Sequence, residues 1–330
     1  MSLCIIQENE CDDDYVQSWY PVSPSCDLKK GQNKAVSLFG VKWLLFRTMT
    51  GEVAFIKRHC AHMGADLCQG KVVDESIECP LHAWRFDTTG QCIHIPSLEA
   101  PLPDRKIVHL PCEEKYGVIF VFWGEEVLFP IPSPPGLANP QIFSPVLTEQ
   151  VESNYKVLAV NTFDTQHFKH VHNRQFIDEP AIYQSAKYVL CIDFKVKIYQ
   201  RKRLVDFILS ARKDTFMLSG ECWGGNIMAL RNHDFNAFAI VSLQPINKNE
   251  AKAYIVTMKE STENRLAVVL DRLVLISSSW LFYNFLKADL KAIKNIRLHQ
   301  AGLLDDIDNG ARKFWNYFKS LPRINTEKKE

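Results

Sequence analysis

Short runs of apolar and β-branched residues follow one another through the first third of the chain, with turn residues between them. Ala35–Phe39 and Val41–Phe46 flank Gly40, and Glu52–Ile56 follows a further turn. Runs of this length and composition, separated in this way, predict a small antiparallel β domain. Gly117–Gly124 is almost continuously apolar and predicts a strand that is buried on both faces.

The pattern is mixed in the second half of the chain. Residues 150–172 predict a helix with polar and histidine side chains, whereas residues 189–258 alternate as in several antiparallel strands. Residues 263–300 predict a long helical stretch, and residues 308–321 predict a final helix with an apolar face. The fold class is therefore α+β, with a small antiparallel β domain followed by an antiparallel sheet and long C-terminal helices.

A proline-rich stretch separates the two halves. Residues 125–145 contain six of the 16 prolines, which is typical of a linker. The chain of 330 residues is also long enough for two domains. We place these domains at residues 17–125 and 126–330.

Composition excludes several classes of protein. Hydrophobic residues make up 46% and charged residues 23%, as in a globular protein with a sizeable core, and the formal net charge is +1. Arg201–Arg203 is short and is interpreted as a solvated turn, so no nucleic-acid surface is expected. Leu273–Leu286, the most apolar stretch, has 14 residues. It is too short to span a bilayer and predicts a core helix.

The cysteines and the N-terminus bear on the cellular compartment. Met1–Asp14 is acidic and lacks the basic start and apolar run of a signal peptide. We therefore expect a cytoplasmic protein whose thiols are reduced. Two of the ten cysteines, Cys60 and Cys79, belong to a candidate metal site. The other eight are expected to be packing residues: Cys4, Cys11, Cys26, Cys68, Cys92, Cys112, Cys191 and Cys222.

Two short pairs of candidate metal ligands lie between residues 57 and 86. Cys60 and His62 form the first pair, and Cys79 and His82 form the second after a gap of 16 residues. Each pair follows a β run, so two loop tips can enclose one inorganic centre. Thiolate and imidazole disfavour magnesium and calcium, which leaves zinc or an iron–sulfur cluster. Zinc fingers usually pair Cys with Cys and His with His, whereas mixed pairs suit a 2Fe–2S cluster with two cysteines on one iron and two histidines on the other.

The spacing of these pairs, with Ala83 and Trp84 directly after the second, resembles the Rieske domain of Rieske non-haem iron oxygenases. The resemblance implies one 2Fe–2S cluster held by Cys60, His62, Cys79 and His82. A structural zinc site is the alternative, and it would make the protein a zinc-stabilised binding module.

A second set of residues resembles the mononuclear iron motif of the same family. It consists of Asn161, Asp164, His167 and His172. Two imidazoles and one carboxylate on one face of Fe(II) leave positions open for O₂ and substrate. His172 lies about 140° around an ideal helix from His167, so the helix must distort or end between them. His170 is the competing histidine, and the resemblance favours His172.

The resemblance implies a third iron ligand, an acidic residue on a long C-terminal helix. Asp289 fits best because it follows the apolar run that ends at Leu286, where a buried carboxylate is costly unless a metal compensates it. A surface carboxylate paired with a neighbouring lysine is the other interpretation of Asp289. The alternative ligands are Asp305, Asp306 and Asp308, which capping of the last helix would also explain.

The resemblance gives Asp164 and Asn161 catalytic positions without making them ligands. Asp164 is expected to accept hydrogen bonds from His167 and from a cluster histidine, for which His82 is the candidate. Carboxylates of this kind orient ligating imidazoles. In the family this connection crosses between the subunits of a head-to-tail trimer, so a homotrimer is expected.

The resemblance covers about residues 17–320 and implies a Rieske domain at residues 17–125 and a catalytic mononuclear iron domain at residues 126–330. It implies a terminal oxygenase that resembles the homotrimeric monooxygenase branch. Electrons would come from a separate NAD(P)H-dependent reductase or a ferredoxin, because the chain has no Gly-rich dinucleotide fingerprint. The product would be a hydroxylated, demethylated or desaturated small molecule of hydrophobic, aromatic or steroid-like character. The alternative is a Rieske electron-transfer protein with a vestigial iron site.

Overall fold

The structure is a computed structural model, and it describes residues 15–98, 104–137, 141–199, 215–260, 265–296, 303 and 307–324. The described chain forms two compact units. Unit 1 contains the residues up to Leu128 together with 245–248 and the C-terminal residues from Arg323, and unit 2 contains 129–244 and 249–322. The predictions for residues 1–14 (with Cys4 and Cys11), for 201–203 and for Asp305 and Asp306 fall outside the described residues.

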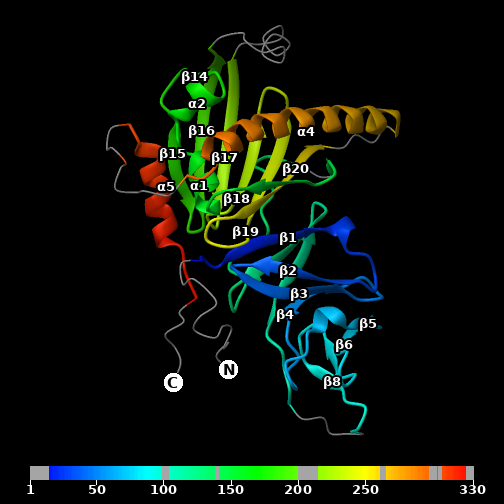
Figure 1. The fold of residues 1–330 in the computed structure, drawn as a ribbon. Helices are drawn as coiled ribbons and strands as arrows, with labels where there is room; N and C mark the ends of the chain where they lie inside the picture. The colour runs from blue at the N-terminus through cyan, green and yellow to red at the C-terminus, as the bar shows by residue number, and fades with distance from the viewer. Residues whose placement is uncertain are drawn as a thin grey trace. The chain divides into compact units, whose positions relative to one another are not determined.

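Unit 1 consists of three small antiparallel sheets, as the short β runs predict. Their strand orders are β1-β11-β10, β2-β3-β4-β9 and β5-β6-β7-β8 (Figure 1). The strands are β1 (Ser18–Pro24), β2 (Asn33–Leu38), β3 (Val41–Arg47), β4 (Val53–Lys57), β5 (Lys71–Val73), β6 (Ser76–Glu78), β7 (Arg85–Asp87), β8 (Cys92–His94), β9 (His109–Leu110), β10 (Cys112–Lys115) and β11 (Val118–Trp123), with 3-10 helices η1 (Ser25–Asp27) and η2 (Leu67–Gln69). All six residues of β11 are buried, which confirms the strand predicted there.

The core of unit 1 extends to the two loops that carry the Cys–His pairs. Phe46, Ile56 and Phe86 come from the strands and pack in one cluster with Cys60 and Cys79. Each cysteine therefore lies at the inner end of its loop, in contact with apolar side chains. Burying the cysteines fixes the inner end of each loop, because a close-packed interior leaves little room for movement.

Unit 2 contains a nine-stranded antiparallel sheet and the helices that cover it. The strand order is β12-β20-β19-β18-β17-β16-β14, with β13 paired to β20 and β15 paired to β16. The strands are β12 (Gln141–Phe143), β13 (Leu147–Val151), β14 (Arg174–Phe176), β15 (Ala181–Ala186), β16 (Val189–Ile198), β17 (Thr215–Trp223), β18 (Ile227–Asn232), β19 (Ala237–Pro245) and β20 (Ala251–Glu260). The helices are α1 (Tyr155–Asn161), α2 (His167–Val171), α4 (Arg265–Ile293) and α5 (Asn309–Ser320), and α4 lies across the strands of the sheet (Figure 1). The predicted sheet and C-terminal helices are confirmed. The core helix predicted over Leu273–Leu286 is only partly correct, because Leu275 and Leu286 are buried whereas Leu273, Ile276 and Trp280 are exposed.

The single helix predicted over residues 150–172 is wrong. Residues up to Val151 belong to β13, and two short helices follow, separated by residues 162–166. The side chain of Asn154 caps the start of α1 by accepting a hydrogen bond from the Lys156 N–H. Asp164 accepts one from the Gln166 N–H in the same way. Asn and Asp side chains compete with the helical backbone for N–H groups, so they start and interrupt helices.

Helix α5 packs tightly on the turn that carries Asp164. A Cβ atom at Gly310 would lie 2.0 Å from the carbonyl oxygen of Phe163, so only glycine permits this approach. The rings of Phe163 and Phe314 stack with centroids 5.6 Å apart, and the Gln166 amide donates to Asp308 at 2.5 Å. Contacts with α5 therefore stabilise the turn between α1 and α2.

Candidate metal centres

The two loops of unit 1 reach their tips through similar tight turns. In the first, Gly64 has φ +73° and donates its N–H to the Cys60 carbonyl. In the second, Ala83 has φ +54° and donates its N–H to the Cys79 carbonyl. Each turn folds the loop back over its own cysteine, so the histidine of each pair lies at the tip.

The structure brings the four predicted cluster ligands together as two like pairs. Cys60 and Cys79 are 4% and 3% exposed, while the two histidines are exposed. The Nδ1 atoms of His62 and His82 are 3.2 Å apart. The His62 ring also stacks on Trp84, with ring centroids 4.3 Å apart and an angle of 4° between the planes. The sulfur atoms thus form an inner pair and the imidazoles an outer pair.

The environment of the cysteines fits a metal-bound pair of thiolates. Burial, together with the neighbouring Cys79, raises the pKa of the Cys60 thiol to about 11. A thiol with this pKa is neutral at pH 7, so two buried thiolates require a compensating cation. An iron centre would supply that charge. The inner pair of cysteine sulfurs and the outer pair of imidazoles match the ligand arrangement of a Rieske cluster.

An ion pair stabilises the first loop at its base. The Arg58 guanidinium contacts both carboxylate oxygens of Asp66, and Arg58 Nε lies 2.7 Å from Asp66 Oδ1. The hydrogen bond from Arg58 holds the pKa of the Asp66 carboxyl at about 2. Asp66 also accepts a hydrogen bond from the Cys68 N–H and so caps η2. The loop is therefore closed by an ion pair that persists at any pH near neutrality.

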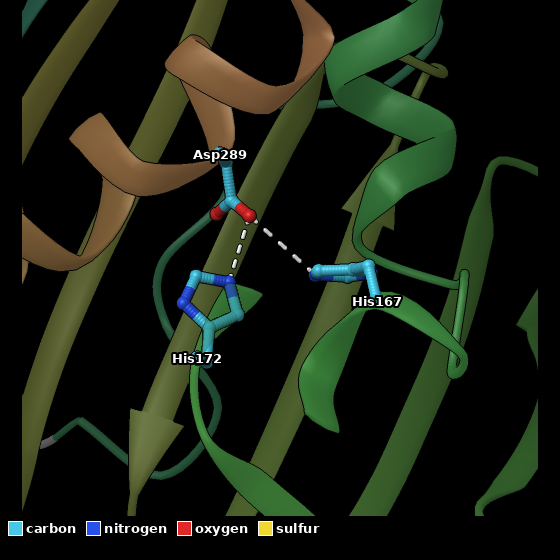
Figure 2. Close-up of side chains that lie close together, drawn as sticks. All are labelled: His167, His172 and Asp289. Atoms are coloured by element: carbon cyan, nitrogen blue, oxygen red, sulfur yellow. Dashed lines mark hydrogen bonds and ion pairs between the residues drawn. The ribbon is translucent and has the colours of Figure 1, made fainter. Parts of the chain in front are cut away.

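The second centre lies where α2 and α4 meet in unit 2. His167 is the first residue of α2, His172 follows its last residue, and Asp289 lies on α4. Asp289 Oδ1 is 2.7 Å from His172 Nε2 and 3.5 Å from His167 Nε2 (Figure 2). The three ligand atoms all lie within 4.8 Å of one another. Because α2 ends at Val171, the ring of His172 can turn toward the same point as that of His167, as the spacing requires.

The three side chains form a set suited to a divalent metal. His172 and Asp289 are 4% and 6% exposed. Burial lowers the pKa of His172 despite the adjacent Asp289, so the imidazole is neutral and its nitrogen lone pair is available. Burying a carboxylate opposite two imidazole nitrogens costs free energy unless a cation compensates its charge. Two histidines and one carboxylate with open positions are typical of non-haem Fe(II).

Asp164 faces Nδ1 of His167, the ring nitrogen on the side away from the candidate metal centre. Its Oδ2 is 3.5 Å from His167 Nδ1. Burial alone would raise the pKa of the Asp164 carboxyl, but the adjacent His167 ring and the hydrogen bond from the Gln166 N–H outweigh burial and hold it below the usual range. An ionised Asp164 favours a proton on Nδ1, which leaves Nε2 of His167 free to bind a metal.

The remaining predicted residues have distinct positions. The Asn161 amide nitrogen lies 3.4 Å from His167 Nε2, beside the centre. His170 is exposed on α2 and does not belong to the ligand group. Asp308 precedes α5 and accepts a hydrogen bond from Gln166. Of the two candidate aspartates among the described residues, Asp289 lies beside the two histidines and Asp308 does not.

One aromatic contact was not predicted from the sequence. The ring of Phe285 stacks on His172, with centroids 3.6 Å apart and an angle of 9° between the planes. Phe285 precedes Asp289 by four residues on the same helix, so the two side chains share a face of α4. That spacing is the sequence signal that could have identified it.

Comparisons with known proteins agree with the first centre. Residues 18–112 match the family model described as the Rieske [2Fe-2S] domain. Aminopyrrolnitrin oxygenase PrnD of Pseudomonas fluorescens is 34% identical over 167 residues, which are 47% of this chain and 45% of that protein. The oxygenase component of 3-ketosteroid-9-alpha-monooxygenase of Rhodococcus rhodochrous is 29% identical over 168 residues, which are 48% and 43% of the two chains. The matched stretch spans less than half of each of these relatives.

The whole fold is similar to that of solved structures. Dicamba monooxygenase bound to dicamba superposes with a TM-score of 0.67 at 17% identity, over 94% of this chain and 97% of that one. The likeness therefore includes both units. The chain carries a Rieske [2Fe-2S] domain and is a homologue of the Rieske oxygenases.

Proposed function

We propose that this chain is the terminal oxygenase component of a Rieske-type monooxygenase system. The observation that carries the proposal is the convergence of His167, His172 and Asp289 within 4.8 Å in a chain that also has a Rieske domain. An electron-transfer protein needs the first centre only. A second buried ligand set with the composition of an O₂-activating iron site indicates that the electrons are used within the same protein.

The ligands are divided between two centres. Cys60 and Cys79 would hold one iron of the 2Fe–2S cluster, and His62 and His82 would hold the other. His167, His172 and Asp289 would hold Fe(II), which when bound supplies the chemistry that activates O₂. We further propose that the cluster belongs to a domain at residues 17–125 and the Fe(II) to one at residues 126–330.

Three residues around the iron site would position the reacting groups. Asp164 fixes the ring and the tautomer of His167 through Nδ1. Asn161 directs its amide toward the side of His167 that faces the centre, where it can contact a bound molecule. Phe285 covers one face of the His172 ring and excludes water from it. None of these residues needs to bind metal to affect turnover.

The exposure of Asp164 supports a contact with another subunit. Its side chain is 35% exposed, and His82 at the cluster tip is exposed as well. Each can therefore be reached by a group from a second chain. We propose a homotrimer in which His82 of one chain donates a hydrogen bond to Asp164 of the next. Electrons would enter each cluster from a separate NAD(P)H-dependent reductase or a ferredoxin.

The side chains beside α2 favour an apolar substrate. Phe168 packs with a cluster of aromatic and aliphatic residues on β14, β16 and β17, which contains Phe176, Phe194, Val196, Ile198, Phe216 and Leu218. We propose that the substrate is a small hydrophobic, aromatic or steroid-like molecule that is hydroxylated, demethylated or desaturated. We place the reaction in the cytoplasm, where the thiols of Cys60 and Cys79 would stay reduced and able to bind iron.

Low-temperature EPR of the dithionite-reduced protein, with an iron count, tests the proposal. A rhombic Rieske signal with about three irons per chain is the expected result, because two irons belong to the cluster and one to the mononuclear site. The same signal with about two irons per chain would favour an electron-transfer protein instead. A protein without the signal that contains zinc would contradict both functions.

Replacing Asp164 with asparagine is expected to retain both metals and lower turnover by about 10- to 100-fold, the usual effect of losing a carboxylate that orients a ligating imidazole. Asparagine has the same shape but no charge, so the proton on His167 Nδ1 is no longer favoured. Asp178→Asn, an exposed acidic residue of the same unit, is the matched control. Unchanged turnover in Asp164→Asn, measured with full iron content, would remove Asp164 from the proposed site.

A further inference from the structure

Helix α4 presents a large apolar face to the outside of unit 2. Leu273, Val274, Ile276 and Trp280 are 58%, 56%, 55% and 62% exposed, and Leu281 is 37% exposed. They occupy little more than two turns of the helix. An isolated exposed apolar side chain is ordinary, but a contiguous group of this size marks a surface that contacts something apolar. We call these five residues the α4 apolar patch.

The opposite side of α4 packs against the rest of unit 2. Leu275, Leu286 and Ile293 are buried against unit 2, and so are the two acidic residues Asp271 and Asp289. The helix is therefore apolar on both faces along its described N-terminal half. A helix that is apolar all round is normally covered on every side. No helix among the described residues is long and apolar enough to cross a bilayer.

The charges of α4 indicate what covers the patch. Both acidic residues in the described part of the helix are buried, so its exposed charges are all basic: Arg272, Lys287 and Lys291. Leu273, Ile276, Trp280, Lys287 and Lys291 follow one another at spacings of three, four, seven and four residues, which places them on one line along the helix. The outer face thus changes from apolar to basic along its length, and it exposes no acidic group.

We propose that the outer face of α4 docks on the surface of an anionic lipid bilayer. A helix that lies in the membrane interface inserts Trp, Leu and Ile side chains at the acyl boundary and places Lys and Arg among acidic headgroups. The α4 apolar patch and the three cations provide both contacts on one face. The Trp280 ring is suited to the interface because it combines an apolar body with an N–H donor.

Docking in this way would connect the bilayer to the metal centre, a consequence that rests on the proposed function. Leu281 of the patch lies one turn from Phe285, which is 37% exposed and stacks on His172. An apolar molecule leaving the bilayer at α4 would therefore meet apolar side chains from the patch to the proposed iron ligand. A lipid-soluble substrate would reach the site without crossing water.

Vesicle co-sedimentation of the metal-loaded protein of 330 residues tests the docking. We expect the protein to sediment with vesicles of 70% phosphatidylcholine and 30% phosphatidylglycerol, and more weakly with phosphatidylcholine alone. The double variant Ile276→Ser/Trp280→Ser should reduce binding at least ~10-fold, because both inserted side chains are lost. Ile93→Ser, which alters an exposed apolar residue of unit 1, is the control and should bind as the unchanged protein does.

A second variant tests the charges without altering the apolar patch. Lys287→Gln/Lys291→Gln should weaken binding to the anionic vesicles and leave binding to phosphatidylcholine unchanged. The proposal is overturned if the unchanged protein stays in the supernatant with both kinds of vesicle. It is also overturned if Ile276→Ser/Trp280→Ser dissociates an oligomer in sedimentation velocity, because the patch would then be an interface between copies of this chain. Neither measurement depends on turnover, so failure here leaves the EPR test of the proposed function intact.

Discussion

Replacing His172 with alanine is expected to remove the mononuclear iron while the 2Fe–2S cluster stays in place. His172 Nε2 is 2.7 Å from Asp289 Oδ1, and its ring is buried, so alanine leaves a carboxylate with a single imidazole beside it. Losing a supporting residue around a metal lowers activity by about 10- to 100-fold, and losing a ligand should lower turnover by more than that. The iron count should fall from about three to about two per chain, with an unchanged Rieske EPR signal.

His170→Ala is the matched control for this prediction. His170 lies two residues earlier in the chain, is exposed, and does not belong to the ligand group. We expect this variant to keep its iron and its turnover. If His170→Ala lost the mononuclear iron and His172→Ala retained it, the assignment of the second histidine ligand would be reversed.

The loops of unit 1 could be predicted from the sequence because their signals are local. Each Cys–His pair occupies three or four consecutive residues and directly follows a short β run, so its place at a loop tip follows from the strand pattern. The strands themselves are short, and turn residues mark their ends. Local patterns of this kind do not depend on how distant parts of the chain meet.

The helix around the second centre could not be predicted, because its interruption depends on side-chain hydrogen bonds. Polar residues spaced through 150–172 resemble one face of a continuous helix. The chain instead breaks where Asp164 accepts the Gln166 N–H and where Gly310 of α5 packs against the Phe163 carbonyl. The second of these contacts joins residues almost 150 positions apart, and no periodicity in the sequence indicates it.

The position of the third proposed ligand, Asp289, also depends on a contact between residues far apart in the sequence. His172 and Asp289 are 117 residues apart, and the sequence pattern indicates only that Asp289 follows an apolar run. Asp308 is also preceded by apolar residues, but the structure has it bound to Gln166 at the start of α5. The sequence could favour Asp289, but its place beside the histidines depends on the position of α4 on the sheet, which is set by packing rather than by helix propensity.

Replacing Cys79 with serine is expected to remove the cluster and to destabilise unit 1. Cys79 is 3% exposed and packs in the same core cluster as Phe86 and Cys60, so the cluster is anchored in the interior of the unit. A serine hydroxyl in place of the sulfur is a poor ligand for iron, and it would be buried among apolar side chains. Loss of a metal centre is one of the few changes that cost more than ~4 kcal/mol of folding free energy.

Two measurements check this prediction, the visible absorption spectrum and the thermal unfolding of the purified variant. Cys79→Ser should lose the visible colour and unfold at a lower temperature. Cys68→Ser, which alters a half-buried thiol in the same stretch of chain, should keep the colour and shift stability by only about 1 kcal/mol. Full colour in Cys79→Ser would mean that another residue binds the iron. Equal destabilisation of both variants would mean that packing, rather than the cluster, stabilises the two loops.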